Sequence, residues 1–175
     1  MRKIIAAAAL SLIAAGAQAQ GVDPSNAIAL DTKDGRVVIK LRPDLAPKHV
    51  AQVKALTKQG FYNGIVFHRV IEGFMAQTGD PTGTGMGKSN LPNIPAEFTP
   101  TPFKRGTLGM ARSSAPDSAN SQFFICFAPA SFLNNQYTVW GEVVSGMEFV
   151  DKIKRGEPPT NPDKIVKMQL ASEAK

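Results

Sequence analysis

Short β-prone segments, separated by turns rich in glycine and proline, run through most of this sequence and limit the folds that it can adopt. Residues 27–31 and 36–41 flank an Asp-Gly pair, which is typical of a β-hairpin. Trp140 lies in another predicted strand, and we expect it in the core. Apolar or alternating runs predict further strands at residues 65–71, 74–78, 123–127 and 165–170.

Two segments have helical spacing instead. Residues 47–59 begin with a proline, which suits a first helical turn, and their apolar side chains recur every three or four residues before Gly60 ends the helix. Residues 146–154 repeat this pattern and stop at Gly156. Many short strands with only two helices predict a mainly β fold, in which a closed or nearly closed barrel has helices plugging or flanking its ends.

The first twenty residues have the three parts of a secretory signal peptide. Arg2 and Lys3 provide the positive start, residues 4–15 the apolar run, and Ala17-Gln18-Ala19 a small-x-small cleavage site. The alternative is a membrane anchor, but that needs about 20 apolar residues. We therefore expect a signal peptide at residues 1–19, cleavage after Ala19, and a mature domain at residues 20–175. The mature protein would be periplasmic or secreted, without membrane attachment.

The composition excludes several kinds of site. With one cysteine and two histidines, the chain cannot form an intrachain disulfide or a structural zinc site with four soft or imidazole ligands. Its 20 Lys and Arg outnumber its 14 Asp and Glu, but the basic residues are scattered singly along the sequence. We expect no nucleic-acid partner, no metal and no cofactor, and nothing in the sequence demands more than a monomer.

The loop at residues 82–89 reads TGTGMGKS and has part of a phosphate-binding motif. That motif needs a glycine where this chain has Thr82, and a helix where Pro92 and Pro95 follow. A glycine-rich surface loop, whose backbone can approach a neighbour or a ligand, is the better interpretation. Cys126 lies in an apolar run, where we expect a small buried side chain rather than a nucleophile.

Two segments place polar side chains beside large apolar ones. Strand alternation puts Arg69 on the same face as Phe67 and Ile71, so that the arginine emerges among apolar neighbours, and it puts Met75 on the same face as Gln77. The same alternation puts Gln122 and Phe124 on one face and Phe123 on the other. The alternative is a set of ordinary core aromatics with one arginine reaching from among them to solvent.

Three segments together resemble the signature segments of cyclophilins, a class of peptidyl-prolyl cis-trans isomerases. They are FHRVIEGFMAQTGD at residues 67–80, GTLGMAR at residues 106–112 and SQFFIC at residues 121–126. The resemblance extends in order over residues 27–170. It implies a closed eight-stranded antiparallel β-barrel capped by two α-helices. It also implies an enzyme that accelerates rotation of X-Pro bonds in proline-containing polypeptides during folding, without a cofactor.

The resemblance further implies a catalytic residue, Arg69, which would donate a hydrogen bond to the prolyl nitrogen and so weaken amide resonance. The implied substrate-binding residues form an apolar proline pocket (Phe74, Met75, Phe124 and Leu133), polar groups for the substrate backbone (Gln77 and Gln122), a groove wall (Ala111) and the border of the cleft (Gly83 and Thr84). A binding module or holdase that uses the same pocket is a competing hypothesis, and a sugar- or lipid-binding barrel is a third.

Three further site positions depart from the common family pattern. Phe132 stands where cyclosporin-sensitive members carry tryptophan, and it cannot supply an indole N–H, so we expect weak cyclosporin binding. Tyr137 stands where many members carry histidine, and Arg112 where many carry asparagine. Arg69 and Phe124 match the family pattern, which favours catalysis.

Overall fold

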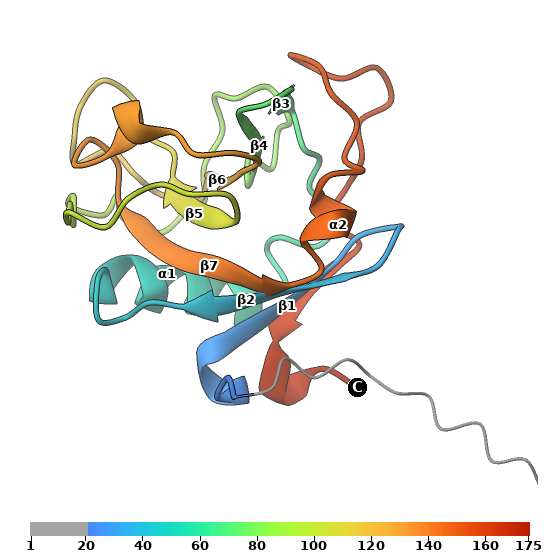
Figure 1. The fold of residues 1–175 in the computed structure, drawn as a ribbon, viewed down its shortest axis with the longest axis horizontal. Coiled ribbons are helices and arrows are strands. Elements are labelled where there is room, and N and C mark those ends of the chain that lie inside the picture. The colour runs from blue at the N-terminus through green and yellow to red at the C-terminus, as the bar shows by residue number, and fades with distance from the viewer. Residues whose placement is uncertain (1–20) are drawn as a thin grey trace, which may run out of the picture.

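One eight-stranded antiparallel sheet organises the computed structural model, which describes residues 21–175 (Figure 1). The predicted signal peptide at residues 1–19 lies outside the described residues. The strands are β1 (Ala27–Asp31), β2 (Arg36–Leu41), β3 (Arg69–Ile71), β4 (Met75–Thr78), β5 (Thr107–Met110), β6 (Phe123–Cys126), β7 (Val139–Ser145) and β8 (Lys167–Leu170). Their order across the sheet is β3-β4-β6-β5-β7-β2-β1-β8.

In the described part of the chain, two α-helices and three short 3-10 helices accompany the sheet. They are α1 (Pro47–Lys58), α2 (Met147–Val150), η1 (Pro24–Asn26), η2 (Ser131–Leu133) and η3 (Ala171–Glu173). Helix α1 packs against β8 and β7, while α2 packs against β2 (Figure 1). Among residues 21–175 there is no helix whose length and apolar character would let it cross a membrane.

The predicted hairpin and first helix are confirmed, whereas β3 and α2 are less than half as long as predicted, and β4, β6 and β8 are shorter by one or two residues. In the hairpin, β1 and β2 pair along their whole length. Strand β3 covers only the end of the segment predicted at residues 65–71. Helix α2 is a single turn within the predicted residues 146–154. After Val150 the amides of Lys152 and Ile153 donate to carbonyls three residues back instead of four, at 3.2 and 3.1 Å, and the Lys154 amide donates to the Asp163 carboxylate at 2.8 Å.

The prediction of a closed barrel is wrong, because the sheet curls without closing. Its edge strands, β3 and β8, do not pair with each other. Strand β3 begins only at Arg69, so residues 64–67 before it are not part of a strand. These residues meet residues 163–165 through an isolated bridge between Val66 and Lys164 and a few backbone hydrogen bonds. Three residues are too few for β3 to form a continuous ladder across the gap.

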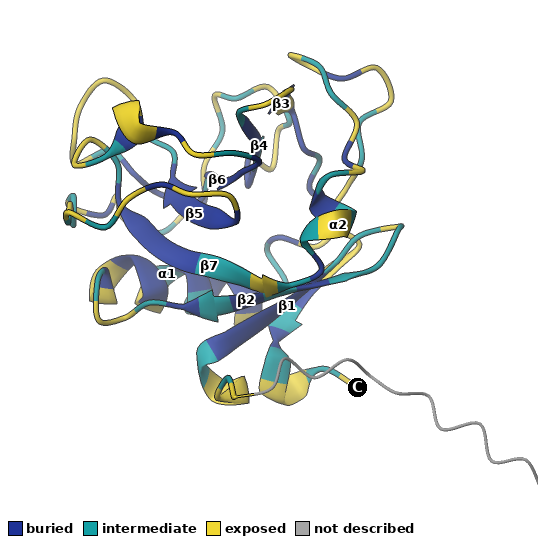
Figure 2. Ribbon diagram, in the orientation of Figure 1, coloured by how far each residue is buried: buried dark blue, intermediate teal, exposed yellow. Residues whose placement is uncertain are grey.

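The central strands are buried along most of their length (Figure 2). Among residues 21–175, alternation along these strands divides the buried side chains into two clusters. The main core contains Trp140, as predicted, and Phe123, which packs edge-on against both Tyr62 and Trp140 at centroid distances of 5.4 Å. The smaller cluster lies on the opposite face of β4 and β6 and contains Phe124 and Cys126. Cys126 is fully buried, as predicted, and burial raises the pKa of its thiol to about 12.

Candidate active site

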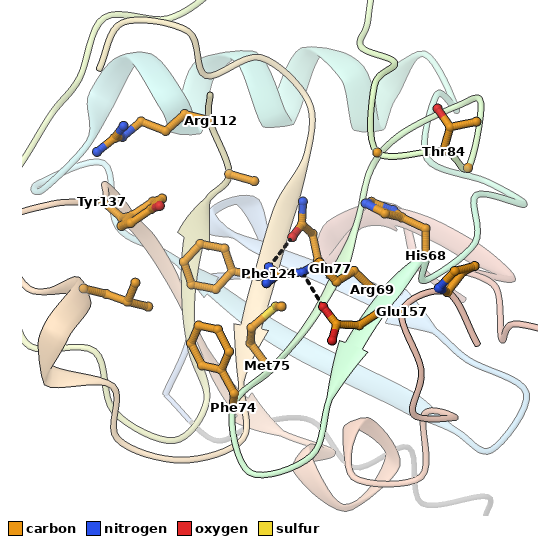
Figure 3. A pocket seen from close by; sticks show the side chains of 15 residues that line it. His68, Arg69, Phe74, Met75, Gln77, Thr84, Arg112, Phe124, Tyr137 and Glu157 are labelled. Carbon is orange, nitrogen blue, oxygen red and sulfur yellow. Dashed lines mark hydrogen bonds and ion pairs between the residues drawn. The ribbon is translucent and has the colours of Figure 1, made fainter. Parts of the chain in front are cut away.

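A pocket of about 690 Å³ opens over the smaller cluster (Figure 3). All the predicted site residues except Gln122 and Phe132 line it. The fold therefore brings together β3, β4, the glycine-rich loop, the segment after β5, β6, and η2 with the residues that follow it. The predicted residues that line the pocket are Arg69, Phe74, Met75, Gln77, Gly83, Thr84, Ala111, Arg112, Phe124, Leu133 and Tyr137. Sequence reasoning missed four other lining residues, His68, Gly85, Glu157 and Pro158.

The floor of the pocket is apolar and rigid. Phe124 is 5% exposed, stacks on Phe103 at a centroid distance of 5.8 Å, and meets the Tyr137 ring edge-on at 5.9 Å. Gly109 on β5 makes this position of the ring possible, because a Cβ there would come within 2.3 Å of Phe124 Cζ. Met75 on β4 is also buried beside the ring. The floor therefore suits a small apolar ring or side chain.

Arg69 supplies a cation at the edge of this floor. It lies opposite Gln77 in the β3–β4 pair. Its Nε donates to Glu157 Oε1 at 3.0 Å, and its Nη1 donates to Gln77 Oε1 at 3.4 Å (Figure 3). The prediction that Ile71 shares the face of Arg69 is confirmed, because both lie in β3 and Ile71 packs on the smaller cluster. The prediction that Phe67 also shares this face is wrong. Strand β3 begins only at Arg69, so the alternation does not extend back to Phe67, which lies in the main core.

Gln122 lies behind the pocket and holds other groups in place. Its Nε2 donates to the carbonyl oxygens of Gly85 and Gly87 at 3.0 and 2.9 Å, and its Oε1 accepts from Gln77 Nε2 at 2.9 Å. All its side-chain polar atoms are therefore engaged. Through these contacts, Gln122 links the glycine-rich loop to Gln77, and Gln77 in turn contacts Arg69.

The glycine-rich loop is folded around the carboxylate of Asp80, a residue that sequence reasoning missed. Asp80 is 1% exposed and accepts hydrogen bonds from the amides of Thr82, Gly85 and Gly87 and from the Thr82 hydroxyl. Burial raises the pKa of this carboxyl, but the hydrogen bonds outweigh burial and lower it to about 2. The sequence signal was an acidic residue directly before a Thr- and Gly-rich run.

A family model described as "Cyclophilin type peptidyl-prolyl cis-trans isomerase/CLD" matches residues 27–170, which include every residue that lines the pocket. The chain belongs to the cyclophilin family. This cyclophilin is a peptidyl-prolyl cis-trans isomerase, the activity for which its relatives are named. It is 53% identical over 193 residues to a probable peptidyl-prolyl cis-trans isomerase of Brucella suis biovar 1, with 100% of this chain and 98% of that protein covered.

Other relatives agree with this assignment. A peptidyl-prolyl cis-trans isomerase of Helicobacter pylori is 40% identical over 131 residues, covering 73% of this chain and 80% of that protein. A crystal structure of a Hirschia baltica cyclophilin is similar with a TM-score of 0.81 at 29% identity, covering 88% and 77% of the two chains. A Cryptosporidium parvum cyclophilin, crystallised in the presence of the dipeptide Ala-Pro, gives a TM-score of 0.76 at 28% identity and covers 82% and 98%.

The rim of the pocket in this cyclophilin contains the positions that depart from the common family pattern. The Arg112 guanidinium lies 4.7 Å from the centroid of the Tyr137 ring and donates from Nη2 to the Gln136 carbonyl at 2.7 Å. Phe132 is 68% exposed, and its ring centroid is 5.3 Å from that of Phe74. Phe132 therefore stands outside the pocket, against one of its walls.

His68 adds a buried imidazole to the pocket wall. It is 7% exposed, and its Nδ1 has no hydrogen-bond partner among residues 21–175. Burial lowers its pKa, and the charge of Arg69 acts in the same direction, whereas Asp80 opposes the shift. Its surroundings therefore favour the neutral imidazole. In the described part of the chain, no group of three or more His, Cys, Asp or Glu side chains is arranged to hold a metal ion.

We expect the Asp80→Asn variant to lose about 2 kcal/mol of unfolding free energy at pH 6. The folded pKa of about 2 lies below the ordinary value of 3.8, and each pKa unit corresponds to about 1.36 kcal/mol. Because the folded pKa is depressed, this contribution is present above about pH 4 and is lost as the pH falls towards 2. Urea unfolding of both proteins between pH 2 and 6 measures it. A constant difference across that range would contradict the role of the ionised carboxylate.

Proposed function

We propose that this cyclophilin accelerates the rotation of X-Pro bonds in folding polypeptides through a hydrogen bond from Arg69 to the prolyl nitrogen. The observation that carries the proposal is the position of Arg69, a permanent cation at the edge of an apolar floor formed by Met75 and Phe124. A proline ring on that floor would bring its nitrogen beside the guanidinium. The Ala-Pro dipeptide present in the Cryptosporidium parvum crystals supports this class of substrate.

The chemistry requires no bond to break. Amide resonance holds the peptide planar, with a rotation barrier of about 18–20 kcal/mol. In the twisted state the prolyl nitrogen regains its lone pair and becomes a better hydrogen-bond acceptor. Arg69 stays protonated, so it acts as a donor to that lone pair and cannot act as a base. One hydrogen bond from a charged donor contributes about 1.5–3 kcal/mol, which is about one to two factors of ten in rate.

Other parts of the pocket would supply the remaining acceleration. The apolar floor would hold the proline ring in one place and exclude water, so that the hydrogen bond from Arg69 acts in a medium of low dielectric constant. The loop held by Asp80 and the side chain of Gln77 border the same space. They are positioned to hold the substrate backbone on either side of the rotating bond.

The direct test is the isomerisation rate of a short X-Pro peptide with and without the mature protein, residues 20–175. We expect acceleration at catalytic enzyme concentrations, and refolding of a protein limited by proline isomerisation should be faster as well. Cyclosporin should inhibit only weakly, because Phe132 cannot donate as an indole does. Absence of acceleration would refute the proposed function, and tight inhibition would refute the argument about Phe132.

We also propose that the protein acts outside the cytoplasm. The support is the signal-peptide pattern of residues 1–19, which ends in Ala17-Gln18-Ala19. After cleavage the chain would begin at Gln20 and have no membrane attachment. N-terminal sequencing of the expressed protein tests the cleavage site, and a start at Met1 would contradict it. We further propose that the mature protein is a monomer. Sedimentation of the same material tests this, and a dimer would contradict it.

A further inference from the structure

The loop after α2 lies against the outer edge of β3. Val70 and Gly156 form an antiparallel bridge, in which each amide donates to the carbonyl of the other residue at 2.8 Å. In an antiparallel pair, the residue before one bridge partner faces the residue after the other. The bridge therefore places Glu157 opposite Arg69, although the two residues are 88 positions apart in the sequence.

The side chains of this pair meet at one specific atom of the guanidinium. Glu157 Oε1 accepts from Arg69 Nε at 3.0 Å. Gln77 Oε1 accepts from Nη1 at 3.4 Å, and Gln77 is itself held by Gln122. Within residues 21–175, Nη2 has no acceptor at hydrogen-bond distance, so its two protons remain available. The guanidinium is thus held from two sides and keeps free donors (Figure 3).

The backbone that carries Glu157 is itself held in place. Arg155 Nε donates to Glu72 at 2.7 Å, and Arg155 Nη1 donates to the carbonyls of Asp151 and Ile153. The Arg155 guanidinium also lies 4.1 Å from the centroid of the Phe127 ring. The loop therefore has its own support, independent of the Arg69–Glu157 contact, and presents Glu157 from a fixed position.

The Arg69–Glu157 pair has little to contribute to stability. The side chains are 44% and 55% exposed, and ion pairs with that exposure are weak. A long arginine side chain on a three-residue edge strand nevertheless has many rotamers available. The acceptors on Nε and Nη1 restrict these rotamers and leave Nη2 as the donor for a ligand.

We propose that Glu157 is a positioning residue that holds Arg69 in the orientation needed to donate to the prolyl nitrogen. This inference rests on the proposed function, and it gives the loop after α2 a role in turnover. Glu157 acts through Arg69 and not on the substrate. Its removal should therefore lower kcat and leave substrate affinity unchanged.

The test compares three variants with the parent protein in the X-Pro isomerisation assay. Glu157→Ala should lower kcat about three- to tenfold, the change expected when one long side chain regains its rotamers, and should leave KM within twofold. Glu157→Gln keeps an oxygen that accepts from Nε and should recover most of kcat. Glu72→Ala is the matched control. Glu72 lies outside the pocket, in the turn between β3 and β4, and accepts from Arg155 of the loop that carries Glu157. Because Arg155 keeps its contacts with Asp151, Ile153 and Phe127, kcat should stay within about twofold of the parent.

Several outcomes would overturn the inference. An unchanged kcat in Glu157→Ala would do so, as would an equal loss in Glu72→Ala, which would assign the effect to the loop as a whole. A Glu157→Gln variant as slow as Glu157→Ala would refute the hydrogen-bonding role. In an Arg69→Ala background, Glu157→Ala should have no further effect, and an independent loss there would also overturn the inference. An inactive parent protein would instead refute the proposed function itself.

Discussion

The Arg69→Ala variant is expected to lower kcat for an X-Pro peptide about 10- to 100-fold while changing peptide affinity less than about threefold. The hydrogen bond from Arg69 strengthens as the prolyl nitrogen regains its lone pair, so its loss affects the twisted state more than the bound planar peptide. A decrease of this size corresponds to one hydrogen bond from a charged donor. The measurement combines isomerisation kinetics with calorimetric titration of the same peptide.

Arg69→Lys is the matched control for charge. Lysine keeps the cation, but its three donors all lie on one nitrogen, so it cannot reproduce the planar fork in which Nε contacts Glu157 while Nη2 points to a substrate. We expect an intermediate kcat. A lysine variant as active as the parent would show that charge alone suffices, and an alanine variant that keeps most of its turnover would refute the role of Arg69.

The elements that sequence reasoning predicted well are those with strong local signals. The hairpin of β1 and β2 has an Asp-Gly turn between an apolar strand and an alternating strand, and α1 has a proline at its start and a glycine after its end. Strand β5 has no such signal, because its four residues include Gly109 and show no alternation. Closure of the sheet depends on the fit between residues far apart in sequence, which local patterns do not encode.

The candidate site also combines residues that local motifs predict with residues that only long-range pairing brings in. Most of the predicted site residues lie in continuous motifs, and the β4–β6 pairing brings Gln77 beside Phe124 as those motifs imply. Glu157 was missed because it lies in a Gly-Glu-Pro-Pro segment without periodicity, and only the bridge between Val70 and Gly156 brings it to Arg69. His68 was missed because one buried histidine in a strand resembles a core residue.

Phe123 and Phe124 are adjacent residues whose side chains point to opposite faces of β6. Each is a buried phenylalanine of β6, but Phe123 belongs to the main core, and Phe124 forms the pocket floor. Replacing either with alanine should cost about 3–5 kcal/mol of unfolding free energy, because each change leaves a cavity. Urea unfolding measures this shared cost.

Substrate binding should separate the two variants. Phe124→Ala removes the apolar surface on which the proline ring would lie, and losing even part of a buried aromatic contact costs about 1.5 kcal/mol or more, which is at least a tenfold weaker affinity. Phe123→Ala leaves that surface intact, so peptide affinity should stay within about twofold wherever circular dichroism shows the variant to be folded. Phe123→Leu serves if the alanine variant does not fold. Equal losses of peptide affinity in Phe123→Ala and Phe124→Ala would mean that general loosening of β6 weakens binding. An unchanged affinity in Phe124→Ala would show that the proline ring does not bind on this floor.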